Sequence, residues 1–388
     1  MDPALNPYAP GAGAPPPELA GRDDILRTAE IAMARVRAGR HAKGQLLLGL
    51  RGVGKTVLLN EIERRAATSG LETVMIEAPD GRALPDLLLP PLRRSLRRLS
   101  AGERAKEALR TLHAFAAAFK ISLGEAEFGL AAPGTADSGD LETDLPDLFV
   151  AVAEAAREQR TAVVLLIDEV QYLSGRDLGA LIVAVHRITQ RGLPLIVFGA
   201  GLPQLAGLAG DAKSYAERLF DFPPVGSLDA VSARTALREP ARESGADFEP
   251  GALDAIVAAT QGYPYFLQEW GKHVWDAAPR SPITVADAQT ATERAVRELD
   301  AGFFQVRLDR LRPRERDYVR AMAELGSGTH RSGEIADALG MRVQAAGSLR
   351  DRLIRKGMIY SPAHGDTAFT VPRFDAFMRR TMPWPPEE

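Results

Sequence analysis

The sequence predicts an α/β fold, a parallel sheet followed by a helical lid domain and a C-terminal winged helix-turn-helix. Strand-like and helix-like segments alternate from about residue 45 to residue 222, which is typical of a doubly wound sheet. The run 163–167 is apolar at every position, as in a central strand that is covered on both faces. After residue 227 the strand-like segments stop and helical periodicity continues, which indicates a change of domain.

The elements are expected in this order. Helices are expected at 23–36, 53–65, 84–99, 145–159 and 178–191, followed by four more at 230–244, 250–260, 264–277 and 285–299. Strands are expected at 45–48, 73–77, 163–167 and 195–198, with an edge strand just after Arg218 and a further strand at 119–123. The segment before residue 18 is rich in Pro, Gly and Ala, which predicts an extended arm.

Length and composition set the broad class. A chain of 388 residues is expected to form several domains, and we place them at 1–22 (arm), 23–227 (sheet domain), 228–311 (lid) and 312–388 (winged helix). The chain has no cysteine, which excludes disulfides and cysteine-ligated metals and fits a cytoplasmic location. We predict no membrane segment, and a net charge of −3 argues against nucleic-acid binding by the whole surface.

A phosphate-binding loop is the strongest motif. The residues Gly49-Leu50-Arg51-Gly52-Val53-Gly54-Lys55-Thr56 match G-x4-G-K-[ST] at every required position and stand between a predicted strand and a predicted helix. Backbone N–H groups of such a loop cradle phosphates. Lys55 is expected to neutralise the β- and γ-oxygens, and the Thr56 hydroxyl to ligate Mg²⁺.

A second acidic motif ends the central apolar strand. Asp168 and Glu169 follow the run Val163–Ile167 directly, as in a Walker B element. Asp168 is expected to support Mg²⁺, and Glu169 to act as the catalytic base that polarises the attacking water. Strand ends often carry exposed acids, so this motif gains its meaning from the upstream loop.

Together these motifs resemble the AAA+ superfamily and the related STAND ATPases, in particular ATPases related to the origin-recognition and cell-division-control initiators. The resemblance covers nearly the whole chain and implies ATP as the nucleotide. Leu19-Ala20-Gly21-Arg22-Asp23 is similar to the Gly-Arg-Glu box of that group, which implies that Arg22 lies near the nucleotide. The alternative for Arg22 is a surface arginine before a helix.

Two departures from this family pattern predict slow hydrolysis. The strand 195–198 runs into Gly199-Ala200-Gly201 where initiator relatives usually carry a polar sensor, and Gly262-Tyr263-Pro264 stands where they carry a sensor arginine. A Gly-x-Pro element is similar to STAND switch proteins, in which the proline, here Pro264, contacts adenine. Sensors stabilise transition-state charge, so their loss indicates a switch rather than a motor.

Arg218 is a candidate for catalysis across a subunit interface. In AAA+ relatives an arginine before this edge strand can reach the γ-phosphate of a neighbouring subunit, which implies a homo-oligomer. The alternative is an intramolecular partner for Glu217 or Asp221.

The C-terminal segment predicts a winged helix-turn-helix. A short helix at 332–340 precedes a second helix at 343–356 and a predicted two-stranded wing at 358–371. Residues 312–380 hold 13 Lys and Arg against 8 Asp and Glu. The predicted DNA-binding face of the second helix consists of Gln344, Ser348, Arg352 and Arg355.

Three functions therefore remain open. The favoured one is an ATP-gated switch that binds DNA through the winged helix. The second is a STAND-like regulatory ATPase whose C-terminal domain binds a protein partner, as winged helices of switch ATPases often do. The third is a housekeeping NTPase whose C-terminal segment is structural, with turnover that neither DNA nor a partner affects.

Overall fold

The computed structural model describes residues 1–11, 15–99, 102–121, 135–363 and 365–384. Its residues form two compact units. The sheet unit comprises Arg22–Gly49 and Lys55–Val225, and the lid unit comprises Met1–Gly21, Leu50–Gly54 and Gly226–Glu388. The chain therefore leaves the sheet unit for five residues within the glycine-rich loop and then returns to it.

The sheet unit is built on a parallel sheet, as predicted. Its strands run in the order β2-β3-β4-β1-β5, and every neighbouring pair is parallel. The bounds are β1 Gly44–Leu48, β2 Glu72–Glu77, β3 Val163–Asp168, β4 Leu195–Gly201 and β5 Phe220–Asp221. All six residues of β3 and all seven of β4 are buried, which agrees with their continuous apolar sequence.

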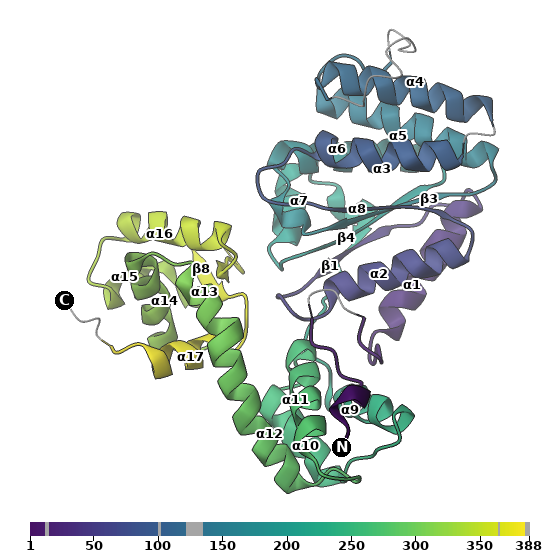
Figure 1. Cartoon of the computed structure of the whole chain (residues 1–388). Helices are drawn as coiled ribbons and strands as arrows, with labels where there is room; N and C mark the ends of the chain where they lie inside the picture. The colour runs from purple at the N-terminus through teal and green to yellow at the C-terminus, as the bar shows by residue number, and fades with distance from the viewer. Residues whose placement is uncertain (12–14, 100–101, 122–134, 364, 385–388) are drawn as a thin grey trace. The chain divides into compact units, whose positions relative to one another are not determined.

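Helices cover both faces of this sheet (Figure 1). The helices α1 and α2 lie on one face, whereas α3, α5 and α6 lie on the other, with α4 packed outside α3 and α5. The helices of the unit are α1 Asp23–Arg37, α2 Lys55–Thr68, α3 Leu84–Arg98, α4 Glu103–Ala118, α5 Leu141–Glu158, α6 Gly175–Gln190, α7 Leu205–Ala212 and α8 Ala216–Leu219.

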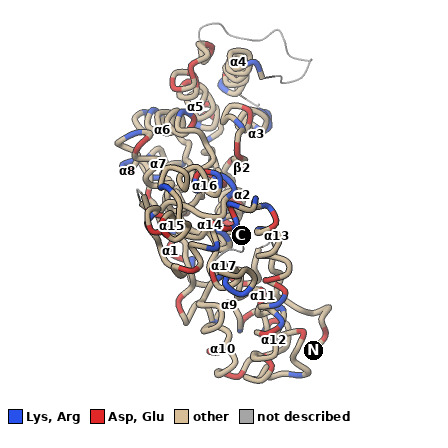
Figure 2. The backbone as a smooth tube through the Cα atoms, turned by 90° about the vertical axis from the view of Figure 1, so that its left-hand side faces the viewer, with Lys and Arg blue, Asp and Glu red and all other residues tan. Residues whose placement is uncertain are grey.

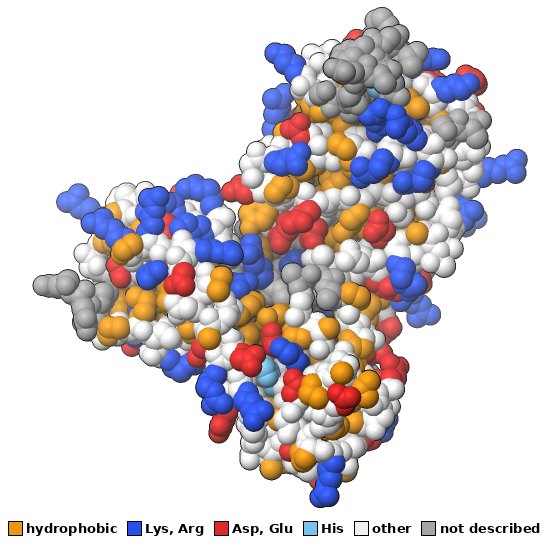
Figure 3. All heavy atoms as spheres, viewed as in Figure 1, with side chains coloured by type: hydrophobic (Ala, Val, Ile, Leu, Met, Phe, Trp, Pro, Cys, Tyr) orange, Lys and Arg blue, Asp and Glu red, His pale blue; other side chains and the backbone are white. Residues whose placement is uncertain are grey.

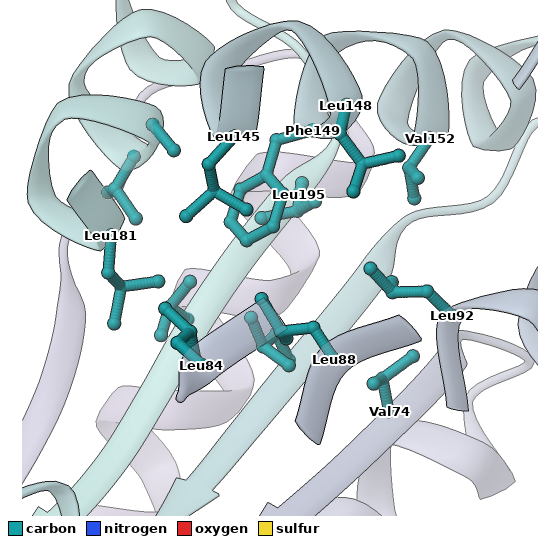
Figure 4. Close-up of a cluster of buried hydrophobic side chains, with 14 of the residues drawn as sticks. Val74, Leu84, Leu88, Leu92, Leu145, Leu148, Phe149, Val152, Leu181 and Leu195 are labelled. Carbon is teal, nitrogen blue, oxygen red and sulfur yellow. The ribbon is translucent and has the colours of Figure 1, made fainter. Parts of the chain in front are cut away.

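The core of the sheet unit lies between the strands and the second helix layer (Figure 4). Leucines of α3, with Leu88 at the centre, face Phe149 of α5 and Val74 of β2. Leu88 and Phe149 have no exposed surface. Fully burying such side chains stabilises a fold by about 1.5–3 kcal/mol each, so this layer fixes the strand ends that carry the site.

One predicted strand is wrong. Phe119 does not begin a strand at 119–123 but ends α4, where its N–H donates to the Phe115 carbonyl at 3.1 Å. Its ring lies 4.6 Å from the ring of Phe115. Residues 119–121 therefore follow the helix as a turn, and residues 122–123 lie outside the described residues.

The lid unit begins with the N-terminal arm. A short 3₁₀ helix spans Pro3–Leu5, and the Tyr8 hydroxyl donates to the Leu237 carbonyl while its ring is buried. Burial raises the pKa of the Tyr8 hydroxyl. The arm contacts α9 Ala230–Glu243 and α11 Pro264–Ala277, and the other two helices that follow are α10 Pro250–Thr260 and α12 Val285–Glu298. These four helices were predicted from the sequence to within one residue at each end.

The C-terminal segment, residues 312–388, belongs to the same unit. A π-helical turn at Leu299–Phe304 and α13 Gln305–Asp309 lead into it. It contains α14 Pro313–Leu325, α15 Ser332–Ala338, α16 Val343–Arg355 and α17 Phe374–Thr381, with a three-stranded antiparallel sheet in the order β6-β8-β7 (His330–Arg331, Asp366–Phe369 and Ile359–Tyr360). The two helices predicted at 332–340 and 343–356 and the predicted pair of strands are present.

None of the described helices is long and apolar enough to span a lipid bilayer.

Candidate nucleotide site

The glycine-rich loop joins β1 to α2, as its sequence predicts. Gly52 and Gly54 have φ angles of +82° and +91°, a backbone region that side chains other than glycine rarely adopt. The loop begins where the Gly49 N–H donates to the Gly201 carbonyl at the end of β4, at 3.1 Å. The backbone path of the loop therefore favours glycine at both positions.

Lys55, Thr56 and Asp168 come together at the carboxyl ends of β1 and β3. The Thr56 hydroxyl donates to Asp168 Oδ2 at 2.6 Å. Lys55 and Asp168 are both buried, with 7% and 6% of their surfaces exposed. Lys55 also opens α2, where the positive end of the helix dipole favours anions.

Asp168 is held in a polar setting despite its burial. Burial raises the pKa of its carboxyl above the ordinary value, while the hydrogen bonds from the Thr56 hydroxyl and the Glu169 N–H oppose this shift. The Glu169 N–H donates to Asp168 Oδ1 at 2.8 Å. A desolvated carboxylate next to a hydroxyl is a suitable ligand pair for a hard divalent cation, so these residues fit the predicted Mg²⁺ role.

Glu169 is presented by an unusual backbone. Its φ of +54° and ψ of 38° place it in the left-handed region, which is uncommon for residues other than glycine. Its carboxylate accepts a hydrogen bond from the side-chain amide of Gln171. The turn therefore sets the direction of the predicted catalytic base, and Gln171 restrains it.

Gln171 is the site residue that sequence reasoning missed. Its Oε1 accepts a hydrogen bond from the Leu202 N–H at 3.0 Å, so the side chain bridges the turn after β3 and the end of β4. Gly201 leaves room for it, because a Cβ at Gly201 would lie 2.7 Å from Gln171 Oε1. The sequence signal for Gln171 is indirect: Gly199-Ala200-Gly201 has no polar sensor side chain, which leaves space at the end of β4 for a polar group from another segment.

The middle of the glycine-rich loop, Leu50–Gly54, belongs to the lid unit and is hydrogen-bonded to other residues of that unit. The Arg51 N–H donates to the Thr370 carbonyl at 3.3 Å, and the Tyr265 N–H donates to the Gly52 carbonyl at 3.1 Å. The Tyr263 hydroxyl donates to the Arg51 carbonyl. Pro264 stands between these tyrosines as the first residue of α11, which places the Gly-Tyr-Pro element beside the loop.

The two other predicted nucleotide-site arginines lie in the sheet unit. Arg22 immediately precedes α1 and is buried, and this burial lowers its pKa. Arg218 is exposed on α8, directly before β5. Asp221, one intramolecular partner considered for it, instead pairs with Lys43 at 3.3 Å. The roles of Arg22 and Arg218 stay predictions.

The predicted DNA face lies on α16. Gln344, Ser348 and Arg355 are exposed, whereas Arg352 is half-buried and lies 3.3 Å from a carboxylate oxygen of Glu315. On the opposite side Ala346, Leu349 and Leu353 are buried, as their 3.6-residue spacing predicts. Figure 2 shows basic residues on α16 and α17.

The parallel sheet carries a phosphate-loop sequence, with Lys55, Thr56 and Asp168 close together and Glu169 directly after Asp168. This arrangement defines a P-loop nucleotide-binding protein. Comparison with known families agrees. Residues 18–198 match the family described as AAA ATPase domain, and residues 301–378 match a domain of unknown function (DUF8462). Residues 18–198 are therefore similar to an AAA ATPase domain.

Comparison with solved structures finds several similar chains. A Walker-type ATPase of Pyrococcus abyssi matches with a TM-score of 0.55 and 19% identity over 97% of this chain and 99% of that chain. The Orc1 protein of Aeropyrum pernix in complex with DNA has a TM-score of 0.47 and 14% identity over 94% of each chain. Cdc6p of Pyrobaculum aerophilum has a TM-score of 0.47 and 13% identity over 98% of this chain and 97% of that chain.

The match to the Pyrococcus abyssi ATPase shows a shared fold. A search of curated proteins found no match.

Proposed function

We propose that this protein is an ATP-binding, slowly hydrolysing switch that binds DNA through a C-terminal winged helix. The observation that carries the proposal is the shared hydrogen bonding of the glycine-rich loop. Arg51 and Gly52 are bonded to Thr370 of the C-terminal segment and to Tyr265 of the lid. A loop that must wrap around phosphates is thereby tied to the proposed DNA-binding segment.

The nucleotide chemistry follows from the residues around Asp168. Lys55 neutralises phosphate charge, and Thr56 and Asp168 hold Mg²⁺. When bound, Mg²⁺ would supply positive charge to the β- and γ-phosphates. Glu169 accepts a proton from the attacking water, since its carboxylate is fixed by the left-handed turn and by Gln171.

Slow turnover is expected from the end of β4. Gly199 and Gly201 provide no side-chain donor to stabilise developing charge. The amide of Gln171 occupies the adjacent space and is engaged with Glu169 and the Leu202 N–H. A base restrained by a hydrogen bond favours long-lived bound nucleotide over rapid hydrolysis.

The DNA role rests on the exposed face of α16. Gln344 and Ser348 can contact base edges, and Arg355 is placed near the helix end to contact phosphate. Arg352 is paired with Glu315, so we expect it to contribute less to DNA affinity than Arg355.

Fluorescence anisotropy with labelled duplexes tests this function. The full chain should bind duplex DNA at low salt, with an affinity that changes when ATP replaces ADP. The Lys55→Ala variant should bind DNA without responding to nucleotide. No binding to any duplex at low salt would overturn the DNA part.

A second function is favoured by two features of the same helix. Val343 is 51% exposed, and Asp351 is exposed between the predicted DNA-contacting residues. An exposed apolar side chain and an exposed carboxylate suit contact with a protein partner better than contact with a phosphate backbone. Co-purification of a defined partner, lost when Val343→Asp is introduced, would support the STAND-like alternative.

Assembly through Arg218 is a separate proposal. If Arg218 reaches the γ-phosphate of a neighbour, Arg218→Ala should lower turnover only at protein concentrations at which oligomers form. Mass photometry at several protein concentrations, read together with turnover, tests this. Equal turnover of wild type and Arg218→Ala at every protein concentration would show that Arg218 takes no part in catalysis.

A further inference from the structure

A basic cavity lies within the lid unit. It has a volume of about 430 Å³ and is lined by Arg51, Val306, Arg307, Arg310, Lys356, Gly357 and Met358. We call it the arginine cavity. All seven residues belong to the lid unit, where α13 and the end of α16 meet the middle of the glycine-rich loop.

Its charge is strongly one-sided. Three arginines and one lysine line it, and the buried carboxylate of Glu315 accepts a hydrogen bond from Lys356 at 2.6 Å. Asp309, on α13, is 3.8 Å from Arg316 and also accepts a hydrogen bond from Gln305. Within the described part of the chain, no ion pair is found for the guanidinium groups of Arg307 and Arg310.

Arg307 is held in place at this cavity. Its guanidinium lies 3.8 Å from the centre of the Phe303 ring and donates to the Phe303 carbonyl at 3.1 Å. Burial, then the charges of Arg51 and Arg310, lower the pKa of Arg307 to about 10. Like charges gathered in a half-buried space oppose folding, so a cluster of this kind calls for a counter-charge.

The floor of the cavity is shaped by the loop itself. The Arg51 guanidinium packs closely against Gly357: a Cβ at Gly357 would lie 2.3 Å from Arg51 Nη2. The side chain of Arg51, a residue of the glycine-rich loop, therefore forms part of the cavity wall. Figure 3 shows Lys and Arg side chains gathered over the C-terminal segment around α16.

We propose that the arginine cavity binds a small polyphosphate anion and that this anion acts as a second, regulatory ligand. Guanidinium groups bind phosphate oxygens in pairs and keep their charge when partly desolvated. The guanidinium groups of Arg307 and Arg310, for which no ion pair is found among the described residues, suit the negative charge of a di- or triphosphate. A volume of about 430 Å³ is typical of small-ligand sites. Through Arg51, the bound anion contacts the loop that holds the substrate nucleotide.

Calorimetric titration of the full chain with sodium tripolyphosphate tests the site. Wild type should bind two equivalents, one at the glycine-rich loop and one at the arginine cavity. Lys55→Ala should retain the second, and Arg307→Gln/Arg310→Gln should retain the first. Combining all three changes should abolish both. The two glutamines should weaken the cavity site by about tenfold per arginine.

Arg294→Gln/Arg297→Gln on α12 is the matched control, because both side chains are exposed. It should leave both equivalents unchanged. Thermal melting separates loss of binding from loss of folding. Since removing like charges relieves repulsion, the Arg307/Arg310 variant should melt no lower than wild type without ligand.

Two results would overturn the proposal. One is the absence of binding to Lys55→Ala, and the other is equal binding by Lys55→Ala with and without the Arg307 and Arg310 changes. Displacement of tripolyphosphate from Lys55→Ala by a short duplex, with loss of duplex affinity in the Arg307/Arg310 variant, would instead assign the cavity to nucleic-acid phosphates. The tripolyphosphate titration and the thermal melting need neither hydrolysis nor DNA binding, so this inference and the proposed function can fail separately.

Discussion

The Thr56 hydroxyl and the Asp168 carboxylate share a 2.6 Å hydrogen bond between α2 and β3. Asp168→Asn should keep this bond geometry while removing the negative charge. We expect Mg²⁺-dependent ATP affinity to fall by about 10–100-fold, with little change when Mg²⁺ is absent. A fluorescent ATP analogue titrated with and without Mg²⁺ checks this. An equal loss in both conditions would show that Asp168 does not act through the metal.

Glu169→Gln should separate binding from hydrolysis. The amide keeps the size of the side chain but cannot accept the proton from water, so turnover should fall by about 10²–10⁴-fold. ATP affinity should remain within about threefold of wild type, as only the base is removed. Single-turnover hydrolysis and equilibrium binding provide the two measurements. A variant that hydrolyses ATP normally would remove Glu169 from its assigned role.

Gln171→Ala should alter turnover without altering nucleotide affinity. It removes the hydrogen bonds to Glu169 and Leu202, which frees the restrained base, so kcat should rise by about tenfold while KM stays constant. Gly201→Ala should act in the same direction, because its Cβ would lie 2.7 Å from Gln171 Oε1. Gly207→Ala, which meets no atom within 4 Å, is the control. A change confined to KM would contradict a positioning role.

Arg355→Gln should weaken DNA binding in a salt-dependent way. If Arg355 contacts one phosphate, the slope of log K against log salt should fall by about one. Arg297→Gln, on α12 with a side chain 69% exposed, should leave the slope unchanged. Anisotropy titrations at four salt concentrations measure both slopes. Identical slopes for the two variants would exclude the α16 face as the DNA contact.

Glu61 should make stability depend on acid pH. Hydrogen bonds from Arg64, and then from Arg65, lower the pKa of its carboxyl to about 2. A lowered pKa stabilises the folded state above the unfolded value and loses that effect as pH falls through the folded value. Because both arginines are partly exposed, Glu61→Gln should cost about 1 kcal/mol at pH 7. The difference should vanish near pH 2 in urea unfolding; a constant difference would contradict it.

The sequence predicted most of the fold because its apolar patterns are strong. The continuous run 163–167 could only be buried on both faces, and the motif Gly49–Thr56 required a strand before it and a helix after it. The run 119–123 misled because its apolar residues alternate as in a strand, whereas Phe119 packs on Phe115 at the end of a helix. Local pattern alone does not distinguish these cases.

The candidate site was predictable only where a motif specifies geometry. Lys55, Thr56 and Asp168 converge as expected from parallel strand ends. Gln171 carries no motif, and its contact with Leu202 depends on how far β4 extends. The arginine cavity joins residues 51, 307 and 356, which are too distant in sequence for any spacing rule to connect.

The passage of Leu50–Gly54 into the lid unit also limits how the chain can be divided. A fragment beginning at Gly226 would lack the carbonyl that accepts the Tyr265 N–H and the N–H that donates to Thr370. A fragment ending at Val225 would retain the complete motif but lose these supports. Excised domains would therefore carry a glycine-rich loop with unsatisfied or altered hydrogen bonds, and functional measurements on this protein require the intact chain.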